Sequence, residues 1–449
     1  MALHDLPARR LATLLRTREL TSEEVVGHVL ARAEADPCGA FVHLDADAAI
    51  GRARALDRAT VGGVLHGLPI ADKDLQLRAG TPTTFGSRAF AGFVAGESDA
   101  LTTLLDRAGA VSIGKTATPE FGYAGYTSSL LHGHTTVPGH PGLGAGGSSG
   151  GAAAAVAARM LPVAPGSDAG GSVRIPAAAC SVVGVKPGRG VVRVPASGAM
   201  GALVTPGALA RDVRDAALLV RALTGHNLLP DDDPGPRRRV AVLRDFHPWR
   251  PITDTVLAPE AEQALARAVA ALAGAGHDVE ELVGPELPGY VDAFTTLWHA
   301  SAAELDPTEA QLALFEPLTR EFVLRGRALA PERIDAARAR LTAIGERVVA
   351  AFAHVDAVLS PTTALPPRPV GWFGDDPEVN FRRQCEYTPH ASFVNVAGLP
   401  AVSLPVVGIG DGLTMSVQVI GRPGGDATVL RLAHELEHCV AGELHRTRG

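Results

Sequence analysis

The chain has 449 residues, 46% of them hydrophobic and 20% charged, and its formal net charge is −7. This composition is typical of a folded protein with a large core, and the negative charge excludes the basic surface of a nucleic-acid-binding protein. No apolar run is long enough to span a bilayer, and the first residues lack the apolar segment of a secretory signal. We therefore expect a cytoplasmic protein without a membrane partner, whose four widely spaced cysteines are reduced.

The predicted elements alternate between helices and strands in the first part of the chain. Thr21 and Glu24 form a capping box, which predicts a helix that begins there. An apolar strand is predicted at 67–71, a helix at 98–109 and a strand at 110–116. This alternation favours an α/β fold in one large domain, with a mixed, mostly parallel central sheet flanked by helices.

The second part of the chain continues this pattern and becomes more helical. A segment rich in Gly, Pro and Ser at 133–151 precedes a helix of small side chains, and a buried strand and a Gly-rich turn follow. We expect a single domain over 1–449, with 227–350 as a more variable helical region within it. Further helices are predicted at 208–224, 258–275, 308–353 and 426–442, and further strands within 355–367 and 399–407.

The stretch "GLGAGGSSGGAAAA" at 142–155 contains two short functional motifs. Gly142, Gly144 and Gly147 have the spacing of a dinucleotide-binding loop, and Ser149 is the central residue of a G-x-S-x-G nucleophile elbow. Both motifs must follow a strand, but the residues before this stretch contain prolines and no apolar run. The stretch therefore favours neither motif, and Ser149 is expected to cap the following helix.

Three residues together suggest a serine–lysine catalytic site. Lys73 lies in the apolar segment "GLPIADKD", Ser148 lies in the glycine-rich stretch, and Ser172 follows Gly170 and Gly171. Two glycines before a serine allow a turn in which consecutive backbone N–H groups point inward. Such a nest of donors can stabilise the oxyanion of an acyl-transfer reaction.

These residues lie in segments that resemble the amidase signature family. "GLPIADKDLQLRAGTPTTFGS" resembles the lysine segment of that family, and "GGSSGGAAAAVAARMLPVAPGSDAGGSVRIPAAACSVVGVKP" resembles its Ser/Gly signature. "FVNVAGLPAVSLPV" and "DGLTMSVQVIGRPGGDATVLRLAHELE" are similar to its C-terminal segment. The resemblance covers most of the chain and is weakest at 227–350. It implies the amidase signature fold and an enzyme that cleaves carboxamide C–N bonds.

The resemblance also implies a Ser–Ser–Lys triad. Ser172 aligns with the nucleophile, Ser148 with the bridging serine that follows a cis peptide bond, and Lys73 with the base. No metal or other cofactor is expected. The implied oxyanion hole consists of the backbone amides of Ala169, Gly170, Gly171 and Ser172.

The chemistry of Lys73 places a demand on its surroundings. A lysine acts as a base only when neutral, so its pKa must fall by about 3 from its free value of about 10.4, which corresponds to about 4 kcal/mol. Burial in an apolar pocket can lower the pKa by this much. The neighbouring acids Asp72 and Asp74 would oppose the change if they faced the ammonium group. We therefore predict that both point away from Lys73 or pair elsewhere.

Other residues are candidates for supporting roles. Asp168 and Arg174 flank the predicted turn, and they form either a plain ion pair or a pair that orients the turn. Tyr123, Tyr126 and Trp298 are candidates for substrate binding, although each is equally compatible with core packing. The chain has no run of large apolar residues that would dock on a lipid surface, which favours a small soluble amide as substrate.

Two alternatives to a simple amidase stay open. The first is a glutamyl-tRNA amidotransferase A-type subunit, which resembles the same family and works with a partner subunit and tRNA. The second is a biosynthetic acyltransferase or esterase that uses the same acyl-enzyme. For the amidase we expect no nucleic-acid partner, and a homodimer is compatible with the sequence.

Overall fold

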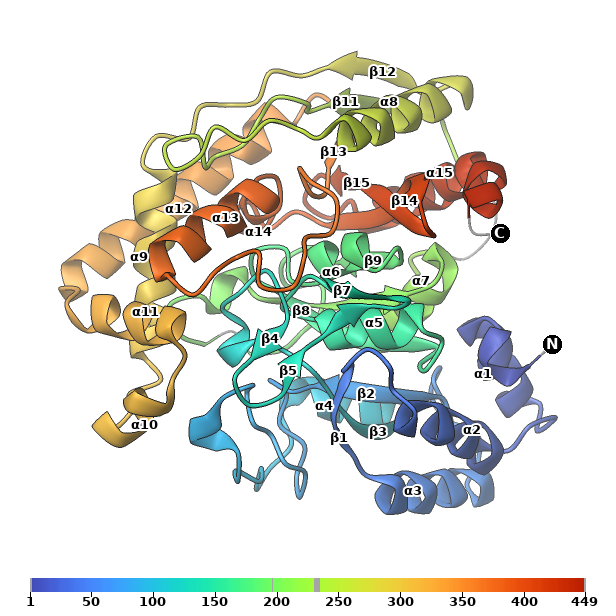
Figure 1. Ribbon diagram of the computed structural model, residues 1–449. Coiled ribbons are helices and arrows are strands. Elements are labelled where there is room, and N and C mark those ends of the chain that lie inside the picture. Colours follow the sequence, from blue (N-terminus) through green and yellow to red (C-terminus); the bar gives the residue numbers. More distant parts are fainter. Residues whose placement is uncertain (1, 196, 230–234, 448–449) are drawn as a thin grey trace.

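The computed structural model describes residues 2–195, 197–229 and 235–447. Its centre is an eight-stranded sheet with helices on both faces (Figure 1). In spatial order the strands are β12 (Asp278–Glu281), β11 (Arg239–Val242), β13 (Ala357–Pro361), β15 (Leu413–Gly421), β14 (Ala401–Gly410), β9 (Val183–Lys186), β10 (Thr205–Ala210) and β8 (Val163–Asp168).

Most neighbouring strands in this sheet are antiparallel. Among the described strands, β11 pairs in parallel with β12 and with β13, and the other neighbours pair antiparallel. The mixed sheet flanked by helices is thus confirmed, but the expectation of mostly parallel strands was wrong. One reason is local: Asp411 and Gly412, with φ values of 50° and 77°, form a tight turn that joins β14 and β15 as a hairpin.

The helices pack on both faces of the sheet and around its ends (Figure 1). They are α1 (Ala8–Arg16), α2 (Ser22–Glu34), α3 (Ala46–Arg58), α4 (Ala100–Arg107), α5 (Gly150–Ala157), α6 (Arg174–Ala179), α7 (Val213–Thr224), α8 (Pro259–Gly274), α9 (Tyr290–Ala303), α10 (Glu309–Leu314), α11 (Pro317–Arg327), α12 (Pro331–Ala351), α13 (Pro377–Tyr387), α14 (Ser392–Val396) and α15 (Asp426–Thr447). The alternation of side chains along β14 explains the two layers. Val402 and Leu404 pack with apolar residues of α7, α8 and α15, whereas Ala401 packs with those of α12 and α14.

A second, three-stranded sheet carries the amino-terminal part of the chain. Its strands are β1 (Phe41–Leu44), β3 (Val111–Thr116) and β2 (Pro69–Lys73), and the two predicted strands of this region are β2 and β3. The predicted capping box is present at the start of α2, where Thr21 and Glu24 exchange both hydrogen bonds. Because β2 also packs against β8, Lys73 at its end lies near the turn that follows β8.

Two predictions about local structure need correction. Residues 208–210 belong to β10 rather than to a helix, because they pair with β8 and β9, and α7 begins only after its cap, Asp212. The region 227–350 is largely helical as expected, but it also supplies β11 and β12 to the central sheet. Residues 230–234 of that region lie outside the described residues. None of the described helices is long and apolar enough to cross a membrane.

Candidate active site

Lys73 is the last residue of β2, and its side chain is completely buried. Its Nζ atom donates to Ser148 Oγ at 2.7 Å and lies 3.2 Å from Ser167 Oγ. Burial lowers the pKa of Lys73 to about 7, although the negative charge of Asp168 acts in the opposite direction. A substantial fraction of Lys73 is therefore neutral near pH 7, which is the state that a base requires.

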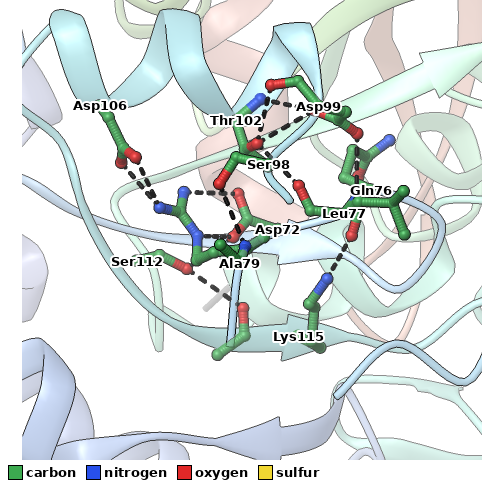
Figure 2. A network of polar contacts seen from close by, with 12 residues as sticks. Asp72, Gln76, Leu77, Ala79, Ser98, Asp99, Thr102, Asp106, Ser112 and Lys115 are labelled. Atoms are coloured by element: carbon green, nitrogen blue, oxygen red, sulfur yellow. Dashed lines mark hydrogen bonds and ion pairs between the residues drawn. The ribbon is translucent and has the colours of Figure 1, made fainter. Parts of the chain in front are cut away.

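The two acids beside Lys73 pair elsewhere, as predicted. Asp72 accepts hydrogen bonds from Arg78 Nε at 2.6 Å and from Ser112 Oγ at 2.8 Å (Figure 2). Asp74 accepts from the backbone N–H of Thr84 at 3.1 Å and from the Thr84 hydroxyl. Neither carboxylate forms an ion pair with Lys73. Burial is therefore the main influence on the pKa of Lys73.

Ser148 follows a cis peptide bond at Gly147–Ser148, as the family resemblance implied. Only glycine fits at position 147, because a Cβ atom there would lie 2.5 Å from the backbone oxygen of Tyr126. The glycine-rich stretch thus allows close contact between two backbone segments at the site. This packing holds Ser148 beside Lys73 Nζ.

The prediction that the side chain of Ser149 caps the following helix was wrong. Ser149 occupies the N-cap position of α5, but its side chain makes no capping bond, and its Oγ lies 3.5 Å from the backbone oxygen of Ser167. The N–H of Gly150, at the start of α5, instead donates to Thr127 Oγ1 at 3.1 Å. A residue distant in sequence therefore supplies part of the helix cap.

Ser172 lies in the turn between β8 and α6, and the carboxylate of Asp168 organises this turn. Asp168 accepts hydrogen bonds from the backbone N–H groups of Gly171 at 2.8 Å and Val173 at 3.1 Å. The amide of Gly171 is therefore already engaged within the protein. By contrast, the amides of Ala169, Gly170 and Ser172 donate to no acceptor among the described residues.

Asp168 is itself held by a buried polar network. Arg174 donates to the two carboxylate oxygens of Asp168 at 2.9 and 3.0 Å, and both side chains are fully buried. Burial alone would raise the pKa of Asp168, but the charge of Arg174 more than offsets it and lowers that pKa. Arg174 also donates to Asn395 Oδ1 at 2.6 Å and to Gln418 Oε1 at 2.8 Å. The Asp168–Arg174 pair thus supports the turn that carries Ser172.

Sequence reasoning missed three residues of this site: Ser167, Asn395 and Gln418. Asn395 Nδ2 donates to both the backbone oxygen and Oδ1 of Asp168 at 2.8 Å. Asn395 and Gln418 fall within the C-terminal segments that resemble the amidase signature family, and this resemblance was the signal available for finding them. Asn395 lies 227 positions after Asp168 in the chain, and Gln418 lies 244 positions after Arg174. No local spacing therefore links these residues.

Two cavities meet at Ser172. A small cavity of about 60 Å³ is bordered by Gly170, Ser172 and aromatic side chains, and a broad cavity of about 690 Å³ is bordered by Ser148, Ser167 and Ser172. Tyr123 and Trp298, two of the proposed substrate-binding residues, border both cavities.

Tyr126, the third proposed substrate-binding residue, borders neither cavity at Ser172. It stacks on Phe373 with ring centroids 4.5 Å apart, and its hydroxyl accepts from Asn380 Nδ2 at 2.9 Å. Tyr126 instead borders a separate cavity of about 560 Å³. Tyr126 therefore packs against the same apolar cluster as Tyr123 and Trp298 but borders a different cavity.

The prediction that the chain has no metal site overlooked an H-E-x-x-H spacing at residues 434–438. In α15, ligand atoms of His434, Glu437 and His438 lie within 4.8 Å of one another. However, Arg214 Nε donates to His434 Nε2 at 3.1 Å, and a guanidinium at this nitrogen opposes the binding of a second cation there. None of these residues borders the two cavities at Ser172. The geometry therefore does not connect this cluster with the candidate active site.

Comparisons with known proteins agree with the fold. The family model described as Amidase matches residues 24–430. The A subunit of glutamyl-tRNA(Gln) amidotransferase from Geobacter metallireducens is 32% identical, and the match covers 98% of each chain. The solved structure of 6-aminohexanoate cyclic dimer hydrolase with its substrate has a TM-score of 0.88 at 27% identity, with 98% of each chain covered. The crystal structure of an amidase has a TM-score of 0.83 at 30% identity and covers 97% of this chain and 100% of that one.

The chain belongs to the amidase signature family of hydrolases, and it is an amidase enzyme.

Proposed function

We propose that the protein hydrolyses a carboxamide through an acyl-enzyme on Ser172, with Ser148 as the proton relay and Lys73 as the base. The observation that carries this proposal is the 2.7 Å hydrogen bond between Lys73 Nζ and Ser148 Oγ in a fully buried site. A base of pKa about 7 in contact with a serine beside the Ser172 turn has the proton affinity that serine activation at neutral pH requires.

In the first half of the reaction, Ser172 Oγ attacks the amide carbonyl carbon. Its proton passes to Ser148 Oγ, while the Ser148 proton passes to neutral Lys73. The tetrahedral intermediate then collapses as the C–N bond breaks, and Ser148 donates a proton to the leaving nitrogen and regains one from the Lys73 ammonium. Water attacks the resulting ester by the same route, which releases the carboxylic acid and restores Ser172. A serine suits the relay because its hydroxyl can accept one proton and donate another.

The backbone amides of Ala169, Gly170 and Ser172 are the proposed donors to the oxyanion. Their N–H groups have no acceptor among the described residues, so they are available when negative charge develops. The resemblance also implied Gly171, but its amide donates to Asp168 Oδ1 at 2.8 Å. We assign Gly171 to the support of the turn, together with Asp168 and Arg174.

A second candidate function is that of an amidotransferase A subunit, because relatives with that name match 98% of this chain. Such an enzyme would release ammonia from glutamine and would need a partner subunit and tRNA. Glutamine hydrolysis together with co-purification of a second subunit would support this function. The esterase or acyltransferase alternative predicts transfer of the acyl group to an added alcohol or amine, which product analysis detects.

The triad is tested by replacing its members one at a time. We expect Ser172→Ala and Lys73→Ala each to lower kcat for an amide by about 10³-fold or more, because triad members act as a unit. Ser128→Ala is a matched control, since Ser128 borders the separate cavity near Tyr126. Circular dichroism and thermal unfolding of each variant show whether the fold is kept. Near-normal amide turnover in a folded Ser172→Ala protein would overturn the proposal.

A further inference from the structure

The two cavities at Ser172 border different members of the proposed catalytic machinery. Ser148 and the proposed oxyanion donor Ala169 border the broad cavity, whereas the donor Gly170 borders the small one, and Ser172 borders both. When Ser172 Oγ attacks a substrate carbonyl, the acyl group therefore lies toward one cavity and the amine group toward the other. The two sides need not accept the same chemical group.

From this arrangement we infer that the substrate is an N-substituted amide with a short, uncharged acyl group in the small cavity and a large, mainly apolar amine in the broad one. This inference rests on the proposed function, because it uses Ser148 as the acid for the leaving nitrogen. The nitrogen must lie within hydrogen-bond reach of Ser148 when the C–N bond breaks. The amine half then extends into the cavity that Ser148 borders, and the acyl half is left with the other cavity.

The size of the small cavity limits the acyl group to a few heavy atoms. Its volume of about 60 Å³ corresponds to about four to six water molecules, at about 10–15 Å³ for each, so an acetyl or propionyl group fits and a phenylpropanoyl group does not. Phe294, Trp298 and Phe381 are among its walls. The aromatic contacts between them, such as the stacking of Phe294 on Trp298 at 5.3 Å, leave little freedom for the pocket to widen.

The chemistry of the small cavity selects against charge. No charged side chain of the described residues borders it. Its Ser392 hydroxyl accepts from Tyr290 at 2.7 Å and from Trp249 Nε1 at 3.1 Å, and its Gln384 accepts from the Gly125 amide at 2.8 Å. The indole N–H of Trp298 is enclosed and has no hydrogen-bond partner among the described residues. One donor cannot compensate the burial of an ionic group.

The broad cavity has room for a large amine. Its volume is about 690 Å³, and much of its border is apolar, including Leu101, Phe121 and Val192. The two charged residues on its border are engaged within the protein. The carboxylate of Asp99 accepts the amides of Leu77 and Thr102, and the guanidinium of Arg189 donates to two backbone oxygens. An apolar aryl or alkyl amine therefore suits this cavity better than ammonia alone.

This division also separates the two candidate functions. Glutamine has a charged amino group and a carboxylate on its acyl half, and its leaving group is ammonia. Its charged half would enter a cavity without counter-ions, which is costly, and the broad cavity would stay empty. The arrangement therefore favours N-substituted amides over glutamine.

A pair of isomeric amides tests the inference directly. N-(2-phenylethyl)acetamide places acetyl on the acyl side, whereas N-methyl-3-phenylpropanamide places the same phenylethyl bulk there. Both leaving groups are primary alkylamines, so their intrinsic reactivities are similar. We expect kcat/KM for the acetamide to be about tenfold or more above that of its isomer, in the range that pocket size differences give. Equal or reversed preference would overturn the inference.

Labelling by a fluorophosphonate distinguishes failure of this inference from failure of the proposed function. If Ser172 reacts with the reagent but the enzyme prefers the propanamide or hydrolyses neither isomer, the division of the two cavities is wrong and the triad stands. If Ser172 does not react, the proposed function itself fails, and this inference fails with it.

Two variants test the two cavities separately, and each should reduce the preference for the acetamide. Phe381→Ala enlarges the small cavity and should raise kcat/KM for the propanamide by about tenfold. Val204→Trp narrows the broad cavity and should lower kcat/KM for the acetamide. When N-methyl amides with different acyl groups are compared, their relative kcat/KM values should stay unchanged in this variant. If Phe381→Ala instead improved only the bulky amine, the small cavity would be the amine site and the inference would be wrong.

Discussion

The residue that defines this site is a lysine without a partner carboxylate. The chain has three lysines, Lys73, Lys115 and Lys186, and all three are fully buried, so arginine supplies the exposed side-chain cations. Lys115 donates to Thr83 Oγ1 at 2.9 Å and Lys186 to the Pro187 oxygen at 2.8 Å. Burial lowers the pKa of both Lys73 and Lys186 to about 7, but only Lys73 contacts the relay serine.

The pH dependence of activity follows from this pKa. Below about pH 7 Lys73 is protonated and cannot accept the Ser148 proton, so kcat/KM should fall as the pH decreases through that value and reach a plateau above it. With three lysines, NMR of isotope-labelled lysine side chains can follow each titration separately, and Lys73→Met assigns the signal. Lys73 and Lys186 should both titrate near pH 7, and the signal that disappears in Lys73→Met should match the kinetic profile. A Lys73 titration near pH 10 would contradict the assignment of the base.

At the scale of elements, the site depends on loops held at the ends of β2 and β8. Lys73 ends β2, and the Ser172 turn follows β8, whose last residue, Asp168, accepts the amides of that turn. Ser148 lies in a third segment, the glycine-rich stretch before α5. The backbone N–H of Ser149 in that stretch donates to the backbone oxygen of Ser172 at 3.1 Å. Backbone contacts therefore fix the distances between the three segments more than the triad side chains do.

Two glycines of the same stretch test this view. A Cβ atom on Gly147 would lie 2.5 Å from a backbone oxygen, whereas one on Gly142 would meet nothing within 4 Å. We expect Gly147→Ala to lower the free energy of unfolding by about 1–3 kcal/mol, as overpacking does. Gly142→Ala should change it by less than about 0.5 kcal/mol, as surface substitutions do. Urea unfolding measures both, and equal stabilities would contradict the close packing around Ser148.

Element-level prediction from sequence succeeded where the signal was local. The capping box at Thr21 and Glu24 and the strand before Lys73 could be recognised from a few neighbouring residues. The directions of the central strands could not, because they depend on pairings between segments far apart in the chain. One local signal was overlooked: Asp411 and Gly412 are a typical hairpin turn, and they mark β14 and β15 as antiparallel.

At the scale of the whole molecule, the fold brings together residues that sequence order separates widely. Lys73 and Ser148 could be linked from the sequence only through resemblance to a family, because no spacing rule connects them. Asn395 and Gln418 reach Arg174 from the C-terminal strands and helices, so their role required the assembled structure. The division of the substrate space into two cavities likewise depends on side chains from many elements.

The central claim is that Ser172, activated through Ser148 and Lys73, forms the acyl-enzyme. The most direct measurement is labelling of the intact chain with a fluorophosphonate, followed by mass spectrometry of its peptides. We predict one labelled residue, Ser172, with a rate that falls below about pH 7 and drops by about 10²-fold or more in Lys73→Ala. A label on Ser149, the central serine of the elbow motif, or no label at all, would contradict the account.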